Sequence, residues 1–115
     1  MTNKQHATEK AREFRNAYGL TKWRISVWEN LGWHWELSSP SELLRFRPDT
    51  YSRRTRWWLD VHMPHRGVAN FFLHGNSPSR LLKRARTRVR EILTGYQQTA
   101  DLIMRGCNCM KENER

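Results

Sequence analysis

KWRISVWENLGWHWELS, residues 22–38, is the stretch of sequence that decides the fold. Apolar side chains occupy every second position on either side of a central turn: Trp23, Ile25 and Val27, then Trp33, Trp35 and Leu37. The turn itself is Asn30-Leu31-Gly32, which has typical turn composition. Because successive side chains of a strand point to opposite faces, residues 22–38 are predicted to form a β-hairpin with one apolar face.

A second hairpin is predicted further along the chain. Strand-like alternation returns at residues 55–63, and a return strand over residues 68–74 follows the turn Pro64–Gly67. Residues 38–54 are less regular and fit either a short extra strand or a long loop. We therefore expect an antiparallel sheet of three to five strands.

Helices are predicted at both ends of the chain. Residues 4–18 carry apolar side chains at steps of three and four, ending at Gly19. Ser77-Pro78 is a strong helix start, since Ser caps free N–H groups and Pro suits the first helical position. A long helix follows, with an apolar stripe expected to pack on the sheet, formed by Leu82, Ala85, Val89, Ile92, Tyr96 and Ile103.

These elements predict an α+β fold, with an N-terminal helix, an antiparallel sheet and a long C-terminal helix packed on one sheet face. The chain has 115 residues, which suits one domain. We expect a single basic α+β domain over residues 1–105 and a flexible polar tail over residues 106–115. No run of about 18 apolar residues is present, so a soluble, cytoplasmic protein without a membrane partner is expected.

The balance of charges favours a polyanionic partner. Twenty-one Lys and Arg residues face eleven Asp and Glu residues, for a formal net charge of +10. Through residue 94, the long helix concentrates six cations with only Glu91 opposing them: Arg80, Lys83, Arg84, Arg86, Arg88 and Arg90. A solvated polar face would also contain Lys and Arg, but uncompensated cations repel one another, which favours contact with phosphates.

A second basic segment lies in the middle of the chain. Its arginines are interleaved with Tyr51 and Trp58, and those predicted to bind nucleic acid are Arg45, Arg47, Arg53, Arg54 and Arg56. Cations beside aromatic rings suit phosphate attraction combined with base stacking, and Trp58 is the ring predicted to stack. The alternative is a mobile loop made soluble by its charge.

Strand alternation also predicts a face that is both aromatic and basic. If Trp23, Trp33, Trp35 and Trp57 face the long helix, the opposite sheet face collects Arg24, Trp28, His34, Arg56, Trp58, His62, Phe72 and His74. Exposed aromatic residues on a sheet can stack bases. Alternatively, the N-terminal helix covers this face through Phe14 and Tyr18, which would make the aromatic residues ordinary core.

The sequence offers only weak signs of an enzyme or a metal site. His62-x-x-His65 with His74 could supply an acid–base pair, as in a small histidine-dependent nuclease. Cys107-x-Cys109 is half of a typical zinc site, and no second pair accompanies it. We expect no catalytic residues, no metal and no cofactor.

The sequence therefore favours a non-enzymatic nucleic-acid-binding protein, with DNA slightly preferred over RNA. The alternative is a small protein-binding inhibitor or adaptor that docks on an acidic surface of a nucleic-acid-handling enzyme through Trp and Arg anchors. The small size would suit a product of a phage or mobile element. No family motif is identified, and the oligomeric state is left open.

Overall fold

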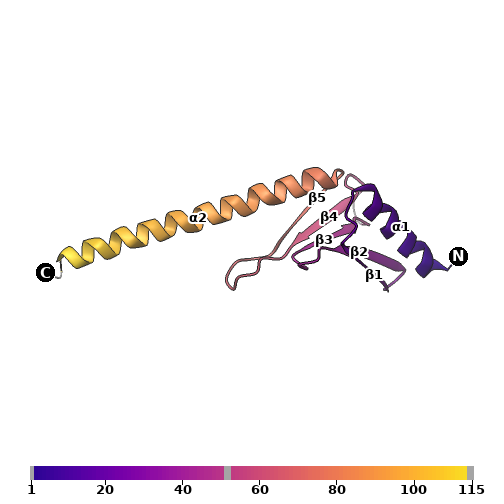
Figure 1. The fold of residues 1–115 in the computed structure, drawn as a ribbon, viewed down its shortest axis with the longest axis horizontal. Coiled ribbons are helices and arrows are strands. Elements are labelled where there is room, and N and C mark those ends of the chain that lie inside the picture. The colour runs from indigo at the N-terminus through magenta and orange to yellow at the C-terminus, as the bar shows by residue number, and fades with distance from the viewer. Residues whose placement is uncertain (1, 51–52, 114–115) are drawn as a thin grey trace. The chain divides into compact units, whose positions relative to one another are not determined.

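The computed structural model describes residues 2–50 and 53–113, and it confirms the α+β class. Helix α1 (Asn3–Ala17) precedes five strands, and helix α2 (Pro78–Asn113) follows them (Figure 1). The strands are β1 (Arg24–Glu29), β2 (Trp33–Ser38), β3 (Leu44–Pro48), β4 (Trp57–Val61) and β5 (Phe71–Gly75). The chain divides into two compact units, Met1–Leu82 and Lys83–Arg115, and each is described by itself.

The sheet of the first unit is a five-stranded antiparallel meander in the order β1-β2-β3-β4-β5. Both predicted hairpins are present, as β1–β2 and β4–β5. Residues 44–48, whose sequence fits either strand or loop, pair with both neighbouring strands. The first hairpin turns through Leu31 and Gly32, both with positive φ, and the φ of Gly32 is 120°. Glycine fits this conformation because it has no Cβ.

The register of the strands assigns each side chain to one of two sheet faces. The apolar face carries most of the core: Trp35, Leu37, Phe46, Leu59, Val61 and Leu73, all of them buried. The other face, called the open face below, carries Arg24, Trp28, His34, Glu36, Arg45, Arg47, Trp58, Asp60, Phe72 and His74. The predicted division of these faces is thus reproduced. Arg56 and His62 lie just outside β4, so the strand register does not assign them.

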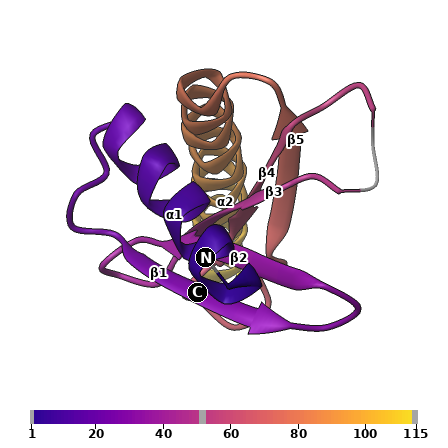
Figure 2. The same cartoon turned by 90° about the vertical axis from the view of Figure 1, so that its right-hand side faces the viewer.

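Helix α1 packs against the apolar face (Figure 2). A capping box between Thr2 and Gln5 begins the helix. The Phe14 ring, 5% exposed, is the central contact. Its centroid lies 4.5–5.5 Å from the ring centroids of Trp57, Trp35 and Phe46. Tilted aromatic pairs at this separation are favourable beyond the apolar area that they bury.

The position of α1 decides between two alternatives for the faces. Trp35 and Trp57 both contact Phe14 of the N-terminal helix, so α1 covers part of the face that the sequence assigns to the long helix. The alternative that α1 covers the open face through Phe14 is wrong for the same reason. Both helices are amphipathic, so periodicity alone does not decide which of them covers these aromatic residues.

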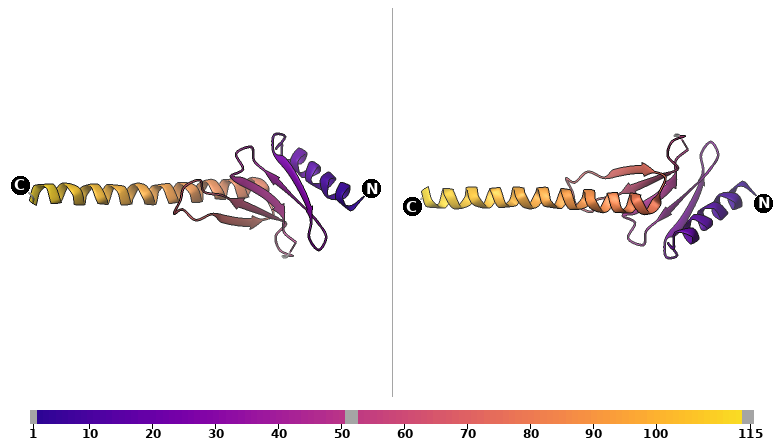
Figure 3. Two further views of the ribbon diagram at one scale, coloured as in Figure 1. Left: turned by 90° about the horizontal axis from the view of Figure 1, so that it is seen from below. Right: turned by 90° about the horizontal axis from the view of Figure 1, so that it is seen from above.

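Helix α2 begins at Pro78 as predicted and is continuous to Asn113, passing through Gly95 without a break (Figure 3). The Ser77 hydroxyl accepts a hydrogen bond from the Arg80 backbone N–H at 3.3 Å. Leu81, which belongs to the first unit, is 1% exposed. Residues 106–113 are helical, whereas the flexibility of this segment and the domain boundary at residue 105 stay predictions.

The expected burial of the apolar stripe along α2 is only partly found. Leu82, Val89 and Ile92 are half-buried, and Ala85 is buried. Tyr96 is 52% exposed and Ile103 is 60% exposed, so the stripe is open to solvent in its second half. Among the described residues, no helix has the length and apolar character needed to cross a membrane.

Replacement of Phe14 with Ala is expected to destabilise the first unit by about 3–5 kcal/mol, because it opens a cavity among aromatic rings. Denaturant unfolding followed by tryptophan fluorescence measures this change, since all six Trp residues lie in that unit. Glu13→Ala, at an exposed position one residue earlier on α1, is the control and should change stability by less than about 0.5 kcal/mol. Equal effects of the two substitutions would contradict the packing described.

Candidate functional site

The centre of the open face is a row of three stacked groups on adjacent strands. Trp58 of β4 lies directly opposite Arg47 of β3, whose guanidinium carbon is 4.7 Å from the indole centroid. Phe72 of β5 stacks on Trp58, with a centroid distance of 4.7 Å and an interplanar angle of 14°. Because β3 and β5 flank β4, the row runs across three strands. The sheet therefore holds a cation and two aromatic rings in one ordered stack.

The outermost ring of this row, Phe72, is the one most open to solvent. Phe72 is 54% exposed, whereas Trp58 is half-buried and its indole Nε1 is enclosed without a hydrogen-bond partner. The neighbours of Trp58 thus limit access to it, and Trp58 stacks on Phe72 from the adjacent strand. A flat ligand that reached this face could extend the stack at Phe72.

A second aromatic pair lies on the same face, on the first hairpin. Trp28 of β1 stacks on His34 of β2, with a centroid distance of 5.7 Å and an interplanar angle of 25°. Trp28 is 39% exposed. The open face therefore presents an exposed aromatic ring on β1 and another on β5, the two edge strands of the sheet.

Ion pairs offset much of the positive charge on the open face. The Arg47 Nε donates a hydrogen bond to Oδ2 of Asp60 at 3.1 Å. The Arg45 Nε lies 3.5 Å from Oε1 of Glu36. A further pair joins Arg24 to Glu42 at 2.6 Å. These pairs are partly or largely exposed and contribute little to stability, but they hold the arginines in place and leave the face nearly neutral. Its character is more aromatic than cationic.

Positive side chains of the first unit also gather in the segment between β3 and β4. Arg53, Arg54 and Arg56 are all exposed there. Asn76, just after β5, holds the backbone of this segment: its Oδ1 accepts from the Arg56 N–H and its Nδ2 donates to the Arg54 carbonyl, both at 3.0 Å. The backbone at Arg54 and Arg56 is thus hydrogen-bonded to the residue that follows β5, and the alternative of a mobile loop stays a prediction. Tyr51 lies outside the described residues.

The helical cations were predicted as part of the same site. Arg80 is exposed in the first unit, and the remaining five are exposed along α2 in the second unit: Lys83, Arg84, Arg86, Arg88 and Arg90. The structure brings Arg45, Arg47 and Trp58 together on the open face. The other five cations belong to the second unit, which is described by itself.

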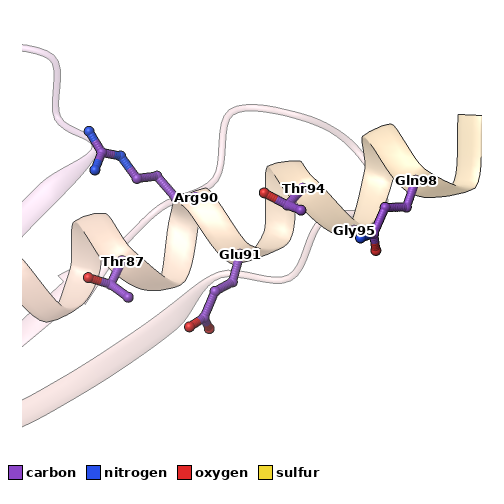
Figure 4. Close-up of a pocket in the computed structure, with 6 residues that line it drawn as sticks. All are labelled: Thr87, Arg90, Glu91, Thr94, Gly95 and Gln98. Atoms are coloured by element: carbon purple, nitrogen blue, oxygen red, sulfur yellow. The ribbon is translucent and has the colours of Figure 1, made fainter. Parts of the chain in front are cut away.

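A shallow depression lies on one side of α2 (Figure 4). All six lining residues belong to that one helix: Thr87, Arg90, Glu91, Thr94, Gly95 and Gln98. In Figure 4 the side chains of Arg90 and Glu91 point to different sides of the helix. A single helix surface does not wrap a small ligand, so this depression adds no site to the open face.

The histidines and cysteines do not assemble into a metal centre in the part of the chain that the structure describes. No group of three or more His, Cys, Asp or Glu side chains there could hold an ion. The Nδ1 of His62 instead lies 3.4 Å from the Asn70 amide nitrogen. Cys107 and Cys109 are exposed free thiols on α2. Because they are two residues apart on a helix, their side chains lie on different sides of it.

Alternation places Phe72 and Trp28 on this face, but the binding residues predicted from the sequence do not include them. Their importance follows from their exposure, which alternation does not give. The pairing of Arg47 with Asp60 depends on the register of β3 against β4. The irregular sequence before β3 conceals that register.

Comparisons with known proteins identify no relative of this chain. Protein-family models, curated proteins and solved structures all give no match. Any function assigned to the open face therefore depends on its own geometry and chemistry.

Proposed function

We propose that the protein binds single-stranded nucleic acid, with bases stacking on the open face. The supporting observation is the row Arg47–Trp58–Phe72, which ends in a half-exposed aromatic ring. Proteins that bind single strands place aromatic rings on a surface where successive bases stack, and each stacked base contributes about 1–3 kcal/mol. Phe72 and Trp28 are the exposed rings of this kind on the open face.

Binding of phosphates requires positive side chains, and the open face has little net positive charge. Arg53, Arg54 and Arg56 supply it in the first unit, beside the end of β4. The six cations at positions 80–90 of α2 supply further positive charge, and five of them are Arg, whose planar fork matches two phosphate oxygens. Stacking and phosphate attraction are thus assigned to different residues.

A single strand suits this chemistry better than a duplex does. The bases of a duplex are stacked on one another and paired, so their flat faces do not reach an aromatic ring on a sheet. A flexible single strand can turn its bases towards Phe72 while exposed arginines attract its phosphates. Every base has a flat face, so this mode predicts weak dependence on base sequence.

Titration of fluorescently labelled single-stranded DNA, single-stranded RNA and duplex DNA, followed by anisotropy at two salt concentrations, tests the proposal. We expect tighter binding of single strands and a steep fall of affinity as salt rises, because bound cations displace counterions. No binding to any of the three would contradict the proposal. It would favour a protein partner for the same Trp and Arg surface.

Phe72→Leu is expected to weaken binding of single-stranded DNA by about 5–100-fold, because leucine keeps an apolar side chain but removes the flat ring. Phe72→Tyr keeps the ring and should bind within about threefold of wild type. Anisotropy measures both, and tryptophan fluorescence confirms that the first unit is folded. Equal affinities for the Leu and Tyr variants would remove stacking at Phe72 from the proposed site.

Arg90→Glu is expected to weaken single-strand binding and to lower the salt dependence of the binding constant, by about one unit of slope for each phosphate that is no longer bound. Arg105→Glu is the matched control, because it makes the same change of charge on an exposed position of α2 beyond the basic segment. If the two substitutions lowered the affinity for single strands equally, the overall charge of the protein rather than the basic segment of α2 would account for binding.

A further inference from the structure

The second half of α2 has an amphipathic pattern that the proposed nucleic-acid contacts do not use. Written as heptads with Leu82 at position a, the helix has an apolar residue at every a position: Leu82, Val89, Tyr96, Ile103 and Met110. The charged residues from position 92 to 112 all fall at b, c or f: Asp101, Arg105, Lys111 and Glu112. Positions a, d, e and g are free of charge over residues 92–110, which is typical of a helix that packs along its length on another helix.

The side chains of this stripe are open to solvent. Every residue from Leu93 to Glu112 is exposed. The large apolar ones are exposed by half to two thirds: Leu93 by 59%, Tyr96 by 52%, Leu102 by 63%, Ile103 by 60% and Met110 by 66%. Most of the stability of a helix in a protein comes from burial of its apolar side, and a contiguous exposed stripe marks an interaction surface.

The distribution of charge along α2 divides the helix into two segments that differ in whether two copies of them repel each other. The segment 80–90 carries six cations and no acid, so two copies of it repel each other. The segment 92–112 carries two cations and two acids and is neutral. Two copies of the second segment meet without net repulsion, and its neutrality gives no preference for a strongly basic or acidic partner surface.

We propose that residues 92–110 of α2 bind the same segment of a second copy of this chain, as an antiparallel helix pair. Antiparallel pairing places the two basic segments at opposite ends of the contact, whereas parallel pairing would place them next to each other. Centred on Asp101, it brings large residues opposite small or slender ones: Tyr96 faces Gly106, and Ile103 faces Thr99. Large–small pairs of this kind allow two helices to approach closely.

The contact area is sufficient for a specific pair. The segment 92–110 is about 27 Å long at about 1.5 Å per residue. Burial of the five exposed large side chains of the stripe removes roughly 500 Å² per copy from water, at about 80–100 Å² for each aliphatic or Met side chain and somewhat more for Tyr, and the exposed small side chains between them bring the total to roughly 600 Å². Specific interfaces begin near about 600 Å² per partner, so the pair lies at the lower end of that range.

Sedimentation velocity of the full chain under reducing conditions, without nucleic acid, tests this proposal independently of the proposed function. We expect a species of twice the chain mass of 13.9 kDa. Ile103→Glu places a charge in the contact and should halve the mass, while Asn108→Glu, on the polar side at position f, should leave it unchanged. Tryptophan fluorescence verifies the fold of the first unit, because the second unit contains no Trp.

A monomeric wild-type chain across the dilution series, or a dimeric Ile103→Glu variant, would overturn the proposal. Disulfide cross-linking tests the orientation, in a background where Cys107 and Cys109 are replaced by Ser. A mixture of Thr99→Cys and Ile103→Cys chains should form a mixed disulfide, since these positions face each other in the antiparallel pair. Efficient cross-linking of Ile103→Cys with itself and not with Thr99→Cys would show a parallel pair and overturn the antiparallel assignment.

Discussion

The packing of Phe14 on the apolar sheet face is the contact on which the rest of the first unit depends. One ring on α1 contacts three aromatic residues from β2, β3 and β4, so a single helical side chain joins the middle of the sheet to the helix. With α1 committed to the apolar face, the exposed rings of Phe72 and Trp28 remain on the other. The proposed stacking site is thus a consequence of which face the N-terminal helix covers.

Much of the first unit could be predicted from the sequence, because side chains in a strand point alternately to the two sheet faces and the apolar residues therefore occur at every second position. Residues such as Trp35 and Leu37 alternate with polar neighbours, and their faces follow at once. The strand β3 is harder to predict, because it is only five residues long, begins within the apolar pair Leu43-Leu44 and ends at Pro48. The contact of Phe14 with the aromatic core could not be predicted, because both helices have an apolar stripe that could supply it.

The candidate site was predicted in part, and its charge was overestimated. Counting arginines between residues 45 and 56 implied a strongly basic surface, but Arg45 and Arg47 are paired with carboxylates on neighbouring strands. Such cross-strand pairs become visible only when the register is known. Conversely, strand alternation predicts an aromatic face that includes Phe72, but only the structure shows that this ring is exposed. The chemistry of the open face therefore follows from pairing and exposure more than from composition.

The continuity of α2 through Gly95 has a geometric consequence for any future change of its length. A basic segment and an apolar segment share one helix, and each residue between them turns the two by about 100° relative to each other. Insertion of one residue near Glu91 would rotate the cations away from their present direction relative to the apolar stripe, whereas insertion of about seven would almost restore it. The number of residues between the two segments thus sets the angle between the cations and the apolar stripe. An insertion of about seven residues should therefore disturb this arrangement less than an insertion of one residue.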